Sequence, residues 1–62
     1  MLYSLYIPAN TIVGSYSSSS YVTLRGDVFI RDAVKTSDGG FDYFVGNNKY
    51  YCSPDFCTAE QQ

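Results

Sequence analysis

Two cysteines are the side chains in this sequence whose spacing most directly suggests a chemical role. Cys52 and Cys57 enclose the tetrapeptide Ser-Pro-Asp-Phe. Pro54 at the second position of a type I turn would place the two thiols opposite each other across a third, C-terminal hairpin, at a Cα separation that a disulfide accepts. Thiols in a reducing compartment stay reduced. The sequence therefore leaves two interpretations open, a pair of structural thiols and a disulfide.

Other chemistry at these cysteines has less support. Their spacing is longer than that of the C-x-x-C oxidoreductase motif. With no histidine in the chain, two thiols supply half of a tetrahedral zinc shell. We therefore predict no metal site.

The remaining groups needed for catalysis are missing from the sequence. There is no histidine to act as a general base and no glycine-rich phosphate loop that leads into a helix. Asp38 and Asp42 form a pair of carboxylates, but a chain of 62 residues leaves little volume for a pocket that excludes water. We expect a protein that is not an enzyme and that uses no cofactor.

The charge balance excludes some partners and favours others. Six acidic and four basic residues give a net charge of −2, without the clustered Lys and Arg of proteins that bind phosphate backbones. Nucleic acid is therefore not an expected partner. No stretch is long and apolar enough to span a membrane, and the first residues, which begin with Met, do not resemble a secretory signal. We expect the protein to act in the cytoplasm.

The elements that position these residues are predicted to be strands. Residues 1–62 are short enough to form one small domain. Runs rich in β-branched and aromatic residues alternate with Gly, Asn, Asp and Pro turns, no helical period is sustained, and only Thr58–Gln61 offers a turn of helix. We expect an all-β fold with little or no helix: five to six antiparallel strands closing into a barrel or sandwich. In strand count and length this resembles small SH3-like and OB-like barrels, a likeness of shape that implies no activity.

Two features of the N-terminal half are less regular. Gly14 interrupts the β-branched and aromatic run Thr11–Tyr16, which suggests a bulge or bend at the glycine. Residues 17–20 are four consecutive serines, which we expect to form a flexible loop.

Three consecutive strands, expected at Val28–Lys35, Phe41–Val45 and Lys49–Cys52, are predicted to form a meander. Asp38-Gly39 favours a two-residue type I′ turn, which pairs Lys35 with Asp42 and Val34 with Tyr43. A second two-residue turn at Asn47-Asn48 would place Tyr43 opposite Cys52. Because strand side chains alternate between faces, an inner face is expected to hold Val28, Ile30, Asp32, Val34, Phe41, Tyr43, Val45, Tyr50 and Cys52. The outer face is expected to hold Phe29, Arg31, Ala33, Lys35, Asp42, Phe44 and Tyr51.

The outer aromatic side chains have two interpretations. The N-terminal strands fold over them and make them part of a sandwich core, or they stay exposed and form an interaction site, as contiguous apolar surface on a small protein usually does. Asp32, the charged residue of the inner face, is expected at the rim of the sheet.

These observations favour a non-enzymatic module that binds a larger protein. Small, acidic, tyrosine-rich proteins without catalytic groups look like accessory inhibitors encoded by phages or mobile elements. Some of these cover the nucleic-acid-binding surface of a host protein, with carboxylates in place of phosphates. The predicted contact residues are Phe29, Asp32, Asp38, Asp42, Phe44, Tyr50 and Tyr51. The alternative is a structural subunit that self-assembles into a homo-oligomer through a sheet edge or the outer aromatic face.

Overall fold

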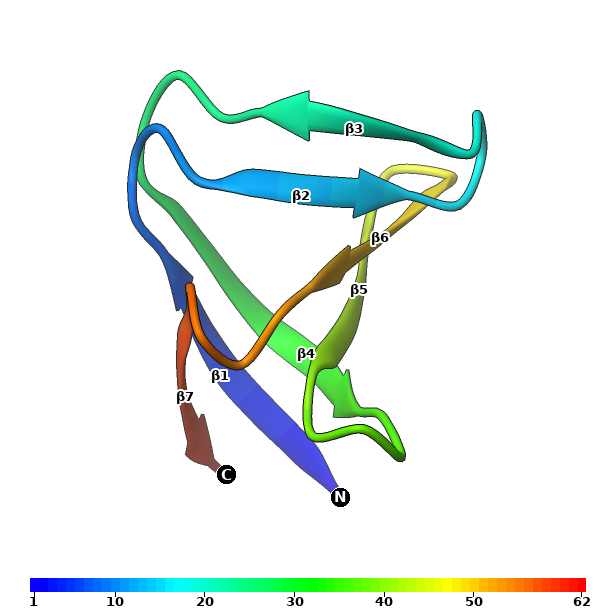
Figure 1. Ribbon diagram of the computed structural model, residues 1–62. Coiled ribbons are helices and arrows are strands. Elements are labelled where there is room, and N and C mark those ends of the chain that lie inside the picture. Colours follow the sequence, from blue (N-terminus) through cyan, green and yellow to red (C-terminus); the bar gives the residue numbers. More distant parts are fainter.

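The computed structural model describes all residues, 1–62, and contains seven antiparallel strands in one sheet with no helix (Figure 1). The strand order is β3-β2-β6-β5-β4-β1-β7, so that β3 and β7 form the two edges. The strands are β1 (Leu2–Ile7), β2 (Ile12–Ser15), β3 (Ser20–Thr23), β4 (Val28–Lys35), β5 (Phe41–Val45), β6 (Asn48–Cys52) and β7 (Thr58–Gln61).

The predicted all-β class is confirmed, but the expected strand count is too low. The sheet curls so that β2 and β3 lie across from β1 and β4, yet it is not closed into a barrel (Figure 1). With no helix present, none is long and apolar enough to cross a membrane.

Seven buried side chains on the concave face form the core. They come from strands far apart in the sequence, and Tyr3 of β1 adds an edge-on contact with the ring of Phe41, at 5.3 Å between centroids. Such aromatic pairs stabilise a fold beyond the area they bury. The core residues are Leu5, Ile7, Val13, Ala33, Phe41, Tyr43 and Cys52.

The predicted register of the β4–β5 hairpin is wrong by one residue. Lys35 pairs with Phe41 and Val34 with Asp42. The loop has three residues in place of two: the Thr36 N–H donates to the Gly40 carbonyl (2.8 Å), and in the loop only Gly39 has a positive φ, of 90°. A type I′ turn needs two consecutive residues with positive φ. Here the Asp38 side chain instead accepts hydrogen bonds from the Thr36 hydroxyl and the Gly40 N–H, which stabilises the longer loop.

A bulge in β4 then changes which residues face the core. Tyr3 pairs with Ala33 but Leu5 pairs with Ile30, so β4 holds one more residue than β1 between these pairs. An extra residue reverses the alternation of side chains beyond it. The predicted faces are therefore wrong for four residues of β4. Ala33 is buried and Lys35 lies opposite the buried Phe41, whereas Val34 is 51% exposed and Asp32 is also exposed.

The β5–β6 turn lies at Gly46-Asn47, one residue before the predicted Asn47-Asn48 turn, and this shifts every cross-strand pair of β5 with β6 by two residues. Val45 pairs with Asn48, and Gly46 has a φ of 63°. Gly adopts a positive φ more easily than Asn, which favours this position for the turn. A shift of two residues keeps every side chain on its face, so Tyr43 is buried as predicted but stacks on Tyr50 and does not face Cys52.

The C-terminal segment does not form a third hairpin. Pro54 occupies the second position of the predicted turn, and the Phe56 N–H donates to the Ser53 carbonyl (3.1 Å). After that turn, however, Thr58–Gln61 forms a strand, and not the turn of helix that its sequence allows. This strand pairs with β1 at the far edge of the sheet.

Candidate functional site

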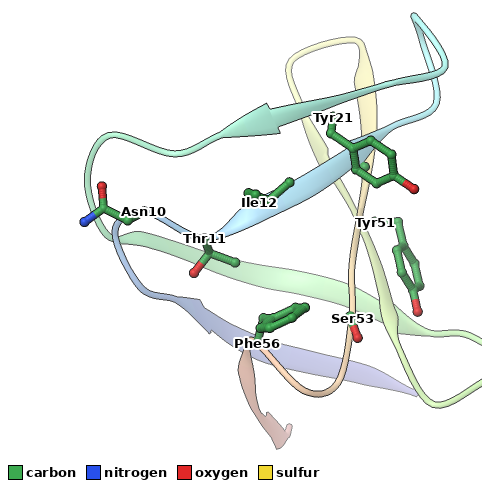
Figure 2. A pocket seen from close by; sticks show the side chains of 8 residues that line it. Asn10, Thr11, Ile12, Tyr21, Tyr51, Ser53 and Phe56 are labelled. Atoms are coloured by element: carbon green, nitrogen blue, oxygen red, sulfur yellow. The ribbon is translucent and has the colours of Figure 1, made fainter.

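A groove on the outer face of the sheet brings together aromatic side chains from separate strands (Figure 2). Tyr21 on β3 is 78% exposed, Phe56 in the β6–β7 loop is 60% exposed, and Tyr51 on β6 stands between them. The volume enclosed is about 520 Å³. We call this surface the tyrosine groove; it is lined by Asn10, Thr11, Ile12, Gly14, Tyr21, Tyr51, Ser53 and Phe56.

Gly14 forms the floor of the tyrosine groove. It pairs with Tyr21 on one side and with Tyr51 on the other, in a continuous register with no bulge, so the predicted bend is wrong. A Cβ built on Gly14 would lie 3.8 Å from Tyr21 Cε1 and 4.0 Å from Tyr51 Cβ. Because the glycine has no side chain, the two rings stand on either side of an open floor. A second depression, of about 270 Å³, continues past the same two rings toward Tyr16.

The Tyr51 ring is held in place by its neighbours. Its hydroxyl donates to Asp38 Oδ2 at 2.8 Å, and the ring lies so close to Gly40 that a Cβ there would overlap it. Hydrogen bonds from the Thr36 hydroxyl, the Gly40 N–H and Tyr51 lower the pKa of Asp38. The hydrogen bond to Asp38 raises the pKa of Tyr51 to about 12. The carboxylate therefore stays ionised while it is engaged by groups of its own chain.

Asp42 is also engaged within the molecule. The Tyr16 hydroxyl donates a hydrogen bond to Asp42 Oδ1 at 3.0 Å, and this bond raises the pKa of Tyr16. Lys49 Nζ lies 3.6 Å from Asp42 Oδ2 and 5.0 Å from the centre of the Tyr16 ring. Such exposed contacts contribute little stability, but they place a compensating positive charge beside the carboxylate.

A second aromatic surface lies over β4 and β5. Phe29 is 74% exposed and Phe44 is 63% exposed, and Phe29 packs on Tyr6 with 5.0 Å between ring centroids. With Ile30, Arg31 and Asp32, these two phenylalanines line a depression of about 280 Å³. We call it the phenylalanine patch. The N-terminal strands extend the sheet and do not cover this face, so the sandwich-core interpretation of these aromatics is wrong.

The predicted contact residues thus divide among three places. Phe29, Asp32 and Phe44 come together in the phenylalanine patch, whereas Asp38, Asp42 and Tyr51 lie at or near the tyrosine groove. Tyr50 points to the inner face, where its ring stacks on Tyr43 at 5.6 Å.

Sequence reasoning missed most of the groove. It assigned none of Ile12, Gly14, Tyr21 and Phe56 to a binding site, because the β2–β3 hairpin and the β6–β7 loop meet only in three dimensions. One local signal existed: Ile12, Gly14 and Tyr16 alternate along the chain, and a glycine in a strand often marks close approach by another group.

Both cysteines are free thiols. Cys52 is buried and Cys57 is half-buried, and both sulfurs point at the Ser53 carbonyl oxygen, at 3.6 and 3.1 Å. Burial raises the pKa of each thiol. Cys52 thus belongs to the core and Cys57 packs against it, and the disulfide stays a prediction.

The chemistry available on these surfaces is that of aromatic faces and hydroxyl groups. No group of three or more His, Cys, Asp or Glu side chains is placed to hold a metal ion, and no buried side-chain polar atom lacks a hydrogen-bond partner. Comparison of the chain with protein-family models, with curated proteins and with solved structures finds no match.

Proposed function

We propose that this protein is a non-enzymatic module that binds a larger protein through the tyrosine groove. The observation that carries the proposal is the exposure of Tyr21 and Phe56 around one concave surface whose third ring, Tyr51, is positioned by its hydrogen bond to Asp38 and its contact with Gly40. Tyrosine is enriched at the energetic centres of protein interfaces, and a ring that is already ordered loses little conformational entropy on binding.

The groove supports this role better than the carboxylates do. Asp38 and Asp42 are occupied by Tyr51, Tyr16 and Lys49, so a partner's Lys or Arg would have to compete for them. The net charge of −2 still favours a basic partner surface. A basic partner surface is what a nucleic-acid-binding protein presents. The acidic charge therefore supports the finer proposal of a phage- or mobile-element-encoded inhibitor that covers such a surface of a host protein in the host cytoplasm.

The experiment is a tagged pull-down from a lysate of the native host with three single variants. Tyr21→Ser and Phe56→Ser remove exposed rings from the groove, and Phe29→Ser is the matched control because it removes an equally exposed ring from the phenylalanine patch. Circular dichroism first checks that each variant folds.

We expect one stoichiometric partner that Phe29→Ser retains. Each groove variant should weaken its binding by about 2 kcal/mol or more, roughly 30-fold in Kd. Loss of the partner with Phe29→Ser alone would move the site to the other patch and contradict the proposal. Binding that weakens as salt is added would support the basic partner surface, because exposed charges are screened.

One observation favours self-assembly as a second candidate function. The sheet is open, and its β3 edge is free of pairing partners. Sedimentation of the purified protein separates the two candidates. Self-assembly predicts a homo-oligomer in the absence of any other protein, and the first candidate does not require one.

A further inference from the structure

We infer that β3 pairs with β3 of a second copy of this chain, which joins the two sheets into one. β3 is the last strand of the sheet and bonds only to β2, so its other side faces away from the molecule (Figure 1). Edge strands are usually protected by a charged residue, a proline or a bulge. The β3 sequence Ser-Tyr-Val-Thr has no charge and no proline, and its pairing with β2 is regular.

The free backbone groups of β3 can be assigned by residue. The Leu24 N–H, just after the strand, donates to the Thr11 carbonyl at 3.0 Å. Because hydrogen-bonding direction alternates along an antiparallel strand, Val22 also bonds toward β2. The N–H and C=O groups of Tyr21 and Thr23 therefore point away from the sheet and are available to another strand.

One symmetric register uses all of these groups. With the two-fold axis at Val22, Tyr21 of each copy lies opposite Thr23 of the other, and their free groups form four N–H···O=C hydrogen bonds. An axis at Tyr21 would instead need Ser19, which lies outside β3 with a φ of 53°. An axis at Thr23 would need Arg25, which also lies outside the strand. The register centred on Val22 is the one that stays within β3.

An apolar cleft beside β3 adds a reason for pairing. It lies between the inner side of β3 and strands β4, β5 and β6, has a volume of about 210 Å³, and is lined by hydrophobic residues alone. Val22 is exposed at its edge. In the proposed dimer the two Val22 side chains face each other on this side of the sheet, which removes apolar surface from water. The cleft is lined by Val22, Leu24, Val28, Tyr43, Val45 and Tyr50.

The opposite edge of the sheet is unsuited to the same pairing. The Gln62 N–H donates to the Leu2 carbonyl at 3.1 Å, so by alternation Glu60 bonds toward β1 and the groups of Ala59 and Gln61 point outward. The symmetric register that uses those outward groups places Glu60 directly opposite Glu60 of the second copy. Like charges in directly opposed positions are destabilising. The sheet therefore has one protected edge and one open edge.

This inference deepens the second candidate function, on which it rests, and is independent of the tyrosine groove, because β3 pairing uses edge backbone groups whereas the groove uses side chains of the outer face. The first test is sedimentation equilibrium of the purified chain and of two variants. We expect a reversible dimer with a Kd between about 1 μM and 1 mM. Val22→Lys should raise that Kd at least about 10-fold, because it places two like charges at the axis. Val34→Lys, at an exposed valine of β4, is the matched control and should leave the Kd unchanged.

Cross-linking tests the register itself. Directly opposed residues of a non-hydrogen-bonded pair lie about 4.5 Å apart at Cα, within the range a disulfide accepts. Val22→Cys should therefore give a covalent dimer under mild oxidation, linked through position 22 by peptide mapping, whereas Thr23→Cys should not. Cys52 and Cys57 are buried and half-buried, and mapping distinguishes any bond they form.

Three results would overturn the inference. The first is a chain that stays monomeric up to about 1 mM. The second is a dimer whose Kd does not change with Val22→Lys. The third is protection of the Tyr21 and Thr23 amides from hydrogen exchange only when a different protein binds, which would assign the edge to a foreign strand. Phe56→Ser, which removes a ring of the tyrosine groove, should leave the dimer Kd unchanged. The groove proposal and the dimer can therefore fail independently.

Discussion

Replacing Gly14 with Ala should stabilise the fold while it weakens binding at the tyrosine groove. Gly14 lies within β2, in regular pairing with Tyr21 and Tyr51, and it does not have a positive φ. A methyl group at this position would lie at ordinary van der Waals distance from both tyrosines, 3.8 Å and 4.0 Å from the nearest atoms. The substitution is therefore free of both backbone strain and overlap.

The magnitude follows from the conformational entropy of glycine. Glycine inside a strand costs about 0.5–1 kcal/mol relative to Ala, so Gly14→Ala should raise the free energy of unfolding by that amount. For a domain of this size that corresponds to a rise in Tm of about 2–8 °C. Gly46→Ala is the matched control: Gly46 has a φ of 63° and no atom within 4 Å of an added Cβ. There the left-handed backbone alone should cost about 1–2 kcal/mol.

Thermal unfolding followed by circular dichroism measures both variants against the parent chain. We expect opposite signs, with Tm higher for Gly14→Ala and lower for Gly46→Ala. The added methyl group also occupies the groove floor, so affinity for the partner should fall although stability rises. A lower Tm for Gly14→Ala would refute the reasoning, because it would mean that Gly14 has the bulge or bend that the sequence suggests and that the groove floor differs.

Three further predictions test the register, the buried tyrosine and the thiols. Ala33→Val should lower the free energy of unfolding by about 1–3 kcal/mol through overpacking, whereas Val34→Ala at an exposed site should change it by less than about 0.5 kcal/mol; urea unfolding measures both. Burial raises the pKa of Tyr43 from 10.0 to about 12. The stability that its neutral form contributes should therefore be complete below about pH 10 and lost as the pH rises through about 12. Tyr43→Phe should reduce this loss in urea titrations at the same pH values. Cys52 and Cys57 should react with iodoacetamide more slowly than a free thiol at about pH 8, because the thiolate is the reactive form and burial raises each pKa; mass spectrometry follows the labelling.

Each of these predictions has an outcome that contradicts it. If Val34→Ala proves more damaging than Ala33→Val, the register expected from the sequence is correct and the β4 bulge is absent. If parent and Tyr43→Phe chains lose stability equally between about pH 10 and 12, Tyr43 is not the titrating group. Rapid labelling of Cys52 would mean that this thiol is not buried. A mass loss of two hydrogens in the folded protein would establish the disulfide alternative.

The sequence by itself determined the fold class and the position of most strands. β-branched and aromatic runs bounded by Gly, Asn, Asp and Pro are local patterns, and the chain follows them. Burial of Phe41, Tyr43 and Cys52 was also predictable, because moving the β5–β6 turn by one residue shifts the pairing by two and keeps each side chain on its face.

Only the tertiary structure decided the details on which function depends. The β4–β5 register is set by the Asp38 side chain with Thr36 and Gly40, and the β4 bulge by pairing with β1 about thirty residues earlier. The insertion of β6 between β2 and β5, and of β1 between β4 and β7, is equally non-local. The β4 bulge and the strand order depend on contacts between residues distant in sequence, and the β4–β5 register depends on side-chain hydrogen bonds inside its loop. The alternation of side chains along a strand encodes neither. The tyrosine groove and the open β3 edge exist only because of that strand order.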